Sequence, residues 1–280
     1  MQDDKDFNLL LDYVSSTSES SSEDECRTSY SSKQIDLIEA NRVINNTNKP
    51  NFEISKIEIS SNLKYEIFKK KLRNYSDKDI CKFILYGWPI GHNGTTTNCN
   101  ASKNHGGARN HPEQIDHYIK SEILQGRIVG PFQESPYTHA IAISPLNSLP
   151  KKDSVDRRII TDLSYPELHS VNSGINKNIY LDEAIQTTYP SVDNVIQLIL
   201  QEKDNCMLYK RDMRKAFRQI KVDPRDIHLL SFRWNEQIYS DTVLTMGLRS
   251  SAYICQRITN AISYMCRTDG YNMVNYLDDF

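Results

Sequence analysis

Hydrophobic positions recur at helical spacing in two segments of the chain. The segment HPEQIDHYIKSEILQG (111–126) places apolar side chains on one helix face, with Pro112 at a helix-opening position and Gly126 at its end. The segment PSVDNVIQLILQEKDN (190–205) repeats this pattern after Ser191, a residue type that caps helices. Both segments are therefore predicted to be amphipathic helices.

Shorter apolar or alternating runs predict strands around these helices. They are RIVGPF (127–132), THAIAISPL (138–146) and CMLYKRD (206–212), the last of which ends on Asp212. Helices and strands interleave without a regular strand-helix-strand rhythm, and this order is typical of an α+β fold.

Residues 33–107 carry weaker signals than the part of the chain that follows them. Helical patterns occur at 34–44 and 62–75, and the stretch 91–107 has the glycine and asparagine content of a loop. We therefore predict that residues 33–107 form a partly helical extension and that residues 108–280 form a separate domain.

Residues 1–32 have the composition of a disordered acidic tail. The tract SSTSESSSEDEC at 15–26 has almost no apolar side chains to bury, so we expect it to stay unfolded. Ser20, Ser21 and Ser22 each precede an acidic residue by three positions, which suits an acid-directed kinase. An unmodified solubilising tail accounts for the same sequence.

Composition and charge exclude several classes of protein. No run approaches the roughly 18 apolar residues of a transmembrane helix, and the N-terminus MQDDKDFNLLLDYV is acidic. The sequence therefore predicts an intracellular protein, cytoplasmic or nuclear, that makes no contact with a membrane. Six cysteines form no CxxC pair and are predicted to be free thiols. The acidic tail hides a mildly basic body, which permits a phosphate-bearing partner.

Three carboxylates stand at the ends of strand-like stretches. Asp278 and Asp279 follow the alternating residues VNYL, and Asp212 ends the stretch 206–212. Carboxylates brought together repel one another unless a cation offsets them, and Mg²⁺ prefers such oxygen ligands. A surface turn together with an unrelated strand-end aspartate is the alternative.

Four motifs give the chain a resemblance to a known family. YLDD (276–279) and KRDMRKAFRQI (210–220) resemble the palm of a reverse transcriptase. LTMGLRSSAYICQ (244–256) is similar to the family's segment beneath nucleotide and template, and SPLNSLPKKDSVDRRIITDLSYP (144–166) resembles its fingers hairpin. The resemblance implies an α+β right-hand fingers-palm fold, with a small antiparallel palm sheet backed by helices. The amino-acid sequences of the motifs resemble those of the DIRS type of retroelement.

The resemblance assigns metal chemistry to the carboxylates. Asp212 and Asp278 would ligate two Mg²⁺ or Mn²⁺ ions, with the carbonyl of Met213 as a backbone ligand. Asp279 would support the metal or the local geometry from the adjacent position. We expect weak binding in the absence of substrate, because such oxygen-only sites rely on substrate phosphates.

The resemblance also places residues against an incoming deoxynucleoside triphosphate (dNTP). Phe217 would lie under the sugar and exclude a 2′-hydroxyl, although a phenylalanine of the hydrophobic core would account for it as well. Gly247 would let the backbone pass close to substrate, and Met246 would be a contact. Thr245 and Met246 depart from the Pro-Phe or Pro-Gln of many retroelement enzymes, which leaves the fit against the base open.

Basic residues are expected to meet phosphates. Arg158 and Lys151 in the fingers hairpin are the favoured contacts for the triphosphate, and Lys152 and Arg157 are alternatives. A second basic cluster around Asp212 would contact nucleic-acid phosphates or form a solvated face. Its members are Lys210, Arg211, Arg214, Lys215, Arg218, Lys221 and Arg225.

By this resemblance the chain is expected to transfer a nucleotide from a dNTP to a primer 3′-hydroxyl on an RNA or DNA template. The motifs end at the YxDD box and nothing matches a thumb, so we predict that the chain of 280 residues is a fragment, inactive alone. The alternative is a non-catalytic nucleic-acid-binding or interaction protein, a relic of a retroelement gene.

Overall fold

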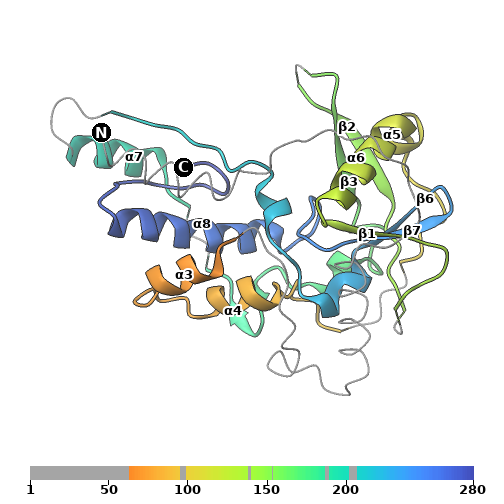
Figure 1. Ribbon diagram of the computed structural model, residues 1–280, viewed down its shortest axis with the longest axis horizontal. Coiled ribbons are helices and arrows are strands. Elements are labelled where there is room, and N and C mark those ends of the chain that lie inside the picture. Colours follow the sequence, from red (N-terminus) through yellow and green to blue (C-terminus); the bar gives the residue numbers. More distant parts are fainter. Residues whose placement is uncertain (1–62, 95–98, 138–139, 153, 187–188, 202–206) are drawn as a thin grey trace.

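Helices and small antiparallel sheets together make up the protein, which confirms the α+β class expected from the sequence (Figure 1). The computed structural model describes residues 63–94, 99–137, 140–152, 154–186, 189–201 and 207–280. The expected acidic tail at 1–32, with Ser20, Ser21 and Ser22, and the helix expected at 34–44 lie outside these residues. Among the described helices, none combines the length and apolar character needed to cross a membrane.

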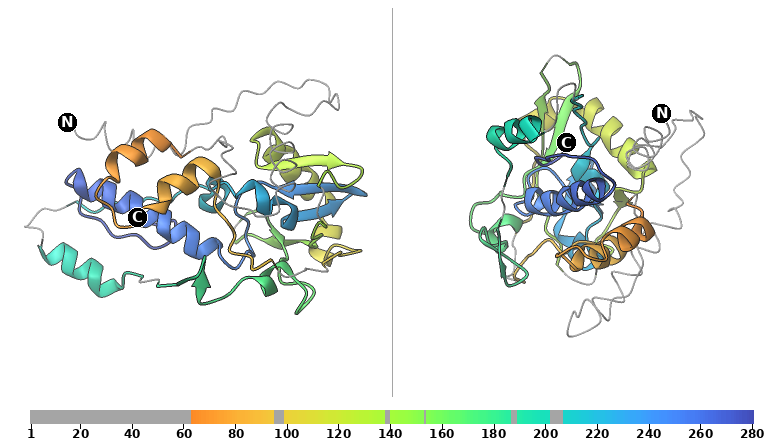
Figure 2. Two further views of the ribbon diagram at one scale, coloured as in Figure 1. Left: turned by 90° about the horizontal axis from the view of Figure 1, so that it is seen from below. Right: turned by 90° about the vertical axis from the view of Figure 1, so that its left-hand side faces the viewer.

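Three of the described helices pack together at one end of the molecule. α3 (Tyr65–Lys71) and α4 (Asp79–Tyr86) lie along α8 (Ser251–Thr268) in Figures 1 and 2. α3 lies inside the stretch 62–75, where a helix was expected. Side chains from all three helices share one hydrophobic core, among them Phe68, Phe83, Ile254, Ile258 and Ile262. The division of the chain near residue 107 stays a prediction.

An ion pair joins α8 to the segment that precedes α4. Arg257 donates to the Asp77 carboxylate through Nε at 2.7 Å and through Nη2 at 2.8 Å. Four aromatic rings lie within 5.3 to 5.7 Å of the guanidinium, those of Phe83, Trp88, Tyr180 and Tyr253. Bidentate geometry and the surrounding rings fix the position of α8 against the N-terminal helices.

A three-stranded antiparallel sheet forms the other end of the molecule. Its order is β1 (Ile128–Phe132), β7 (Gln237–Asp241) and β6 (Ser231–Trp234). β6 and β7 form a tight hairpin whose two central residues have positive φ angles, as two-residue hairpin turns require. α5 (Gly106–Arg109) and the predicted helix α6 (Pro112–Leu124) pack on this end. β1 confirms the predicted strand at 127–132.

The fingers-like hairpin projects from the sheet end at the top of Figure 1. β2 (Leu146–Pro150) and β3 (Arg157–Thr161) pair antiparallel along their whole lengths. A second small ladder, β4 (Ile179–Tyr180) with β5 (Glu183–Ala184), follows after the 3₁₀ turn η1 (Val171–Gly174).

α7 (Val192–Gln201) confirms the second predicted amphipathic helix. The Ser191 hydroxyl accepts a hydrogen bond from the backbone N–H of Asn194 at 3.3 Å, as its expected capping role requires. The apolar stripe of this helix is exposed, because Val192 and Leu200 keep 75% and 78% of their accessible surface. Periodicity therefore located the helix correctly, but not the burial of its apolar face.

The two strands expected to carry the carboxylates are not strands. Residues 207–211 and 271–275 have no regular secondary structure. Asp212 instead takes part in an isolated bridge with Asp279, and Tyr276 bridges to Asp279 across a turn. Of the expected strand at 138–146, Ile143 forms isolated bridges and Leu146 begins β2. The alternating pattern of apolar and polar residues predicted strands here, but apart from Leu146 the described backbone of these stretches forms only isolated bridges.

Candidate active site

The residues YLDD form a tight turn. The backbone N–H of Tyr276 donates to the Asp279 carbonyl at 2.9 Å, and the N–H of Asp279 donates back to the Tyr276 carbonyl at 3.0 Å. Leu277 has a φ angle of 50°, a left-handed conformation that costs a side-chain-bearing residue free energy. Asp278 and Asp279 therefore sit on a strained turn that the surrounding structure must hold.

The turn pairs with the segment that carries Asp212. Arg211 and Phe280 exchange two backbone hydrogen bonds, at 2.9 and 2.8 Å, and the Met213 N–H donates to the Asp278 carbonyl at 2.7 Å. Asp212 lies directly opposite Asp279 between these bonds. Side chains of directly opposite residues in an antiparallel pair share one face, so this pairing brings the two carboxylates together.

Electrostatic repulsion acts on Asp212. Its pKa is raised above the ordinary aspartate value, first by burial and then by the negative charges of Asp278 and Asp279. Lys210 opposes this effect, and its ammonium lies 3.2 Å from an Asp279 carboxylate oxygen. The three predicted catalytic residues therefore interact with one another, as the reverse transcriptase motifs implied.

The donor set suits a hard divalent cation. Asp212, Asp278 and Asp279 offer oxygen atoms only, and burial together with mutual repulsion disfavours ionisation of Asp212 without a cation. In the described parts of the chain, however, no three side chains of the His, Cys, Asp and Glu types are arranged as a ready-made metal site. The carboxylates fit a metal site whose coordination shell substrate would complete.

The glycine loop of the third motif lies against the fingers hairpin. Gly247 has a φ angle of 103°, and a Cβ atom there would lie 2.6 Å from the Thr161 carbonyl oxygen at the end of β3. Gly247 therefore lets the loop pass close to the protein's own backbone, and its predicted close approach to substrate stays a prediction. Met246, the expected contact beside it, is 37% exposed.

Asn172 connects this loop to the fingers. Its side-chain amide donates to the Gly247 carbonyl at 2.7 Å and to the Ser164 hydroxyl at 2.9 Å, and accepts from the Arg249 N–H at 2.8 Å. Its own backbone N–H donates to the Leu163 carbonyl at 2.9 Å. No motif indicated this buried asparagine, because its partners are distant in sequence.

The predicted triphosphate ligands lie along the fingers hairpin. Lys151 has its ammonium 3.8 Å from the Asp156 carboxylate near the hairpin tip, and Arg158 is exposed on β3. Arg157, one of the alternatives, donates to the Ser148 hydroxyl at 2.7 Å and to the Ser148 carbonyl at 2.9 Å. No hydrogen bond or ion pair among the described residues joins Lys151 or Arg158 to the catalytic carboxylates. Their roles stay predictions.

Phe217 lies in the 3₁₀ turn η2 (Ala216–Gln219) that follows the Asp212 segment. It is half-buried and packs against the main hydrophobic core. The alternative that Phe217 is a core residue therefore holds for the buried part of its ring. Met213 is buried, and its carbonyl stays a predicted metal ligand.

The basic cluster around Asp212 divides into two groups. Lys210, Arg211 and Arg214 are exposed. The other four residues bond within the protein: Lys215 to Glu122, Arg218 to Glu122 and Asp241, Lys221 to the Gly126 carbonyl and Thr242, and Arg225 to Asp223. Lys215 is exposed as well, but its ammonium is bonded to the buried Glu122, so the nucleic-acid contact considered for this cluster is retained for Lys210, Arg211 and Arg214.

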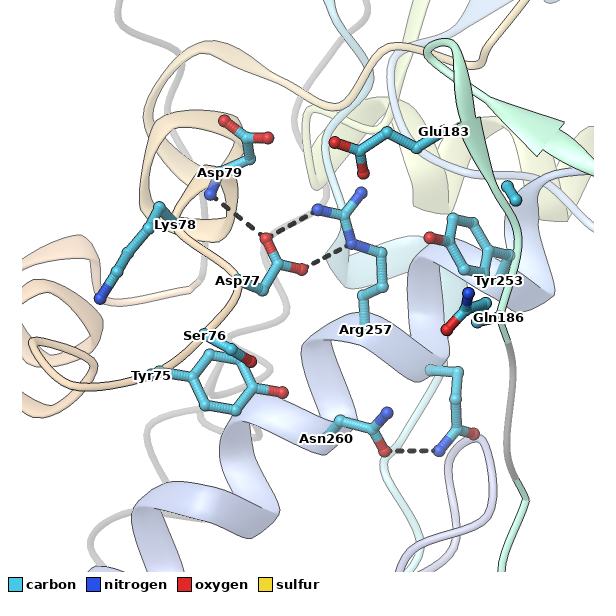
Figure 3. A pocket seen from close by; sticks show the side chains of 12 residues that line it. Tyr75, Ser76, Asp77, Lys78, Asp79, Glu183, Gln186, Tyr253, Arg257 and Asn260 are labelled. Carbon is cyan, nitrogen blue, oxygen red and sulfur yellow. Dashed lines mark hydrogen bonds and ion pairs between the residues drawn. The ribbon is translucent and has the colours of Figure 1, made fainter.

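A pocket of about 730 Å³ lies beside α8 (Figure 3). Arg257 and Asp77 stand between Tyr75 and Tyr253 in this view, and Asn260 lies one turn further along the helix. The predicted catalytic and dNTP-binding residues are absent from its lining. The pocket therefore does not contain the carboxylates but lies next to their turn, since Gln256, which lines it, accepts a hydrogen bond from the Leu277 N–H.

Three carboxylates on paired segments, together with a glycine loop and a basic hairpin, are similar to the palm and fingers of a template-directed polymerase. Residues 149–280 match the family described as reverse transcriptase (RNA-dependent DNA polymerase). This match covers just under half of the chain and includes every proposed site residue, which supports the resemblance for this segment. By this match, the segment resembles an RNA-directed DNA polymerase.

Two solved structures of foamy virus enzymes are similar to the chain. The native protease-reverse transcriptase of prototype foamy virus is 17% identical over 69% of this chain and 22% of that chain, with a TM-score of 0.48. The foamy viral protease-reverse transcriptase dRH in complex with ds DNA is 14% identical over 93% of this chain and 39% of that chain, with a TM-score of 0.49. The chain thus spans about a fifth to two fifths of their lengths. No curated protein matches it.

Proposed function

We propose that the segment 108–280 forms the fingers and palm of a retroelement reverse transcriptase of the DIRS type. The reaction is nucleotidyl transfer from a dNTP to a primer 3′-hydroxyl on an RNA or DNA template, in an intracellular setting. The observation that carries the proposal is the pairing of Asp212 with Asp279 on the turn that also bears Asp278. Sequence-distant segments thereby supply the carboxylates that such chemistry needs.

The carboxylates have a defined role in this proposal. Asp212 and Asp278 would hold two Mg²⁺ or Mn²⁺ ions, which activate the attacking hydroxyl and stabilise the leaving pyrophosphate when bound. Met213 would contribute its carbonyl, and Asp279 would fix the pairing with Asp212. Lys210 partly offsets the negative charge.

Substrate contacts are part of the same proposal. Lys151 and Arg158 would bind the triphosphate, and Met246 and Gly247 would lie at the nucleotide. Phe217 would select deoxynucleotides through the exposed part of its ring. Lys210, Arg211 and Arg214 would contact template-primer phosphates.

Phosphorylation of Ser20, Ser21 and Ser22 by an acid-directed kinase is a separate expectation, which mass spectrometry after kinase treatment would test.

A metal titration tests the site directly. Mn²⁺ binding to the chain, followed by electron paramagnetic resonance, should weaken about tenfold in Asp212→Asn and in Asp278→Asn, because each loses a charged oxygen ligand. Asp156→Asn in the fingers hairpin is the matched control and should bind as the parent does. Equal Mn²⁺ affinity in the parent and both site variants would contradict the proposed metal site.

Primer extension separates the polymerase from the non-catalytic alternative. The assay compares the chain of 280 residues with a version extended by a return strand and a related thumb. The extended version should synthesise DNA on a poly-ribonucleotide template and lose this activity with Asp278→Asn. In the same assay, Phe217→Val should raise ribonucleotide incorporation. Template binding without synthesis would favour the binding protein.

A further inference from the structure

The strained turn at the candidate active site is held by a glutamine of α8. The backbone N–H of Leu277 donates to Oε1 of Gln256 at 2.7 Å. Gln256 is 1% exposed, so water does not compete for this bond. A backbone N–H can only donate, and the Gln256 amide must therefore present its oxygen to the turn.

That orientation leaves the Gln256 amide nitrogen free to donate along the helix. It donates to Oδ1 of Asn260 at 2.7 Å. The same Asn260 oxygen accepts a second bond, from Nδ2 of Asn275 at 2.9 Å, and Asn275 also reaches the Thr259 hydroxyl at 3.2 Å. Since Gln256 and Asn260 lie one helical turn apart on one face of α8, the helix holds the residues before and within the turn at two points.

The helix provides a rigid support for these bonds. The opposite face of α8 is buried through Ile254, Ile258 and Ile262, and Arg257 bonds α8 to Asp77. Leu277, by contrast, is in a left-handed conformation that a free chain would relax. The position of the carboxylate next to it therefore depends on an external support.

We propose that Gln256, Asn260 and Asn275 are positioning residues, which fix the YLDD turn on α8 and so set the distance of Asp278 from Asp212. The consequence for catalysis rests on the proposed function; the support of the turn does not. Gln256 carries the role most directly, because it bonds the turn itself, while Asn260 and Asn275 orient Gln256 and the residue that leads into Tyr276.

Amide hydrogen exchange on the whole chain tests the support without any enzymatic assay. In Gln256→Met, which keeps side-chain length but has no acceptor, the exchange rate of the Leu277 N–H relative to that of Ile258 should rise about tenfold. Gln256→Glu should keep the parent's ratio, because a carboxyl buried between neutral partners such as Leu277 and Asn260 stays protonated and provides both an acceptor and a donor. This conservative variant separates hydrogen bonding from simple packing.

Met265→Ala is the control for a general weakening of α8. Met265 is 1% exposed on the same helix and distant from the turn in sequence, so its truncation should loosen the core and leave the Leu277 ratio unchanged. The proposed support is wrong if Gln256→Met retains the parent's ratio, or if Met265→Ala raises the ratio as much as Gln256→Met does.

Mn²⁺ affinity tests whether support of the YLDD turn by Gln256 affects metal binding at the carboxylates. Gln256→Met should bind Mn²⁺ about three- to tenfold more weakly, and Gln256→Glu and Met265→Ala should bind within about twofold of the parent. If Leu277 exchanges faster in Gln256→Met while Mn²⁺ affinity stays at the parent's value, the positioning role is overturned. If Asp212→Asn leaves Mn²⁺ affinity unchanged, the proposed function fails, and the exchange experiment still decides whether α8 supports the turn.

Discussion

At the scale of single residues, Gly247 shows how one backbone conformation joins two motifs. Its φ angle of 103° is unfavourable for any residue with a Cβ, and a Cβ would also meet the Thr161 carbonyl oxygen at 2.6 Å. Asn172 bonds the Gly247 carbonyl from the fingers side. The contact between the loop and β3 therefore requires glycine at this position, independently of any role in substrate binding.

Gly247→Ala should lower the free energy of unfolding by about 2 to 4 kcal/mol, because conformational strain and the contact with Thr161 add. Urea denaturation measures this loss. Gly270→Ala is the matched control, since Gly270 has a similar φ angle of 93° with nothing within 4 Å of its Cβ position. It should lose only about 1 to 2 kcal/mol. Equal losses in the two variants would show that the contact contributes nothing.

At the scale of elements, a buried charged cluster connects α6 to the segment after Asp212. Glu122 is completely buried in α6 and accepts from Lys215 and from Arg218 at 2.9 Å each. Arg218 also donates to Asp241 at the end of β7 at 2.6 Å. Residues that the sequence offered as a nucleic-acid surface thus hold a helix, a 3₁₀ turn and a strand together.

Glu122→Gln should destabilise the fold by about 3 kcal/mol at neutral pH, because it leaves buried cations without their counter-charge. Burial raises the pKa of Glu122, but Arg218 and Lys215 outweigh it and the net pKa is lowered. The stabilisation is therefore present above the ordinary glutamate pKa and is lost as pH falls through the lowered value. Urea unfolding at pH 7 and at pH 3 should show the gap between parent and variant shrinking in acid. Glu113→Gln, in the first turn of the same helix, should show no such gap.

At the scale of the whole molecule, a buried aspartate makes stability depend on pH in the opposite sense. Asp226 in the 3₁₀ turn η3 (Pro224–Leu229) accepts from the Ile90 N–H at 2.8 Å, which joins the N-terminal helices to the sheet end. Burial, and then the neighbouring charge of Asp223, raises the pKa of Asp226 to about 7. The folded protein therefore holds a proton that the unfolded chain releases near its ordinary pKa of 3.8.

This contribution is fully present below the unfolded pKa and is lost as pH rises toward about 7. Asp226→Asn keeps an acceptor for Ile90 without a charge, so the parent should lose stability relative to this variant between pH 4 and pH 7. The slope should reach at most about 1.4 kcal/mol per pH unit. Urea midpoints across this range measure it, with exposed Asp156→Asn as the control. A constant difference between parent and Asp226→Asn would contradict the raised pKa.

The sequence by itself determined the elements and motifs whose information is local. Helical periodicity located α6 and α7, since apolar spacing and end signals lie within one segment. The motifs also located the segment that resembles a reverse transcriptase and the three carboxylates proposed for its site, because metal chemistry needs particular residue types at particular positions.

Only the tertiary structure decided which distant groups meet. Asp212 pairs with Asp279 through an isolated bridge, although alternation had predicted strands. Asn172, Glu122 and Gln256 carry no local signal, because their hydrogen-bond partners come from other elements. Burial and bonding likewise depend on neighbouring elements, so four of the seven residues of the basic cluster bond within the protein while the apolar stripe of α7 stays exposed. Local pattern fixes what a segment can form, but contact and burial are properties of the packed chain.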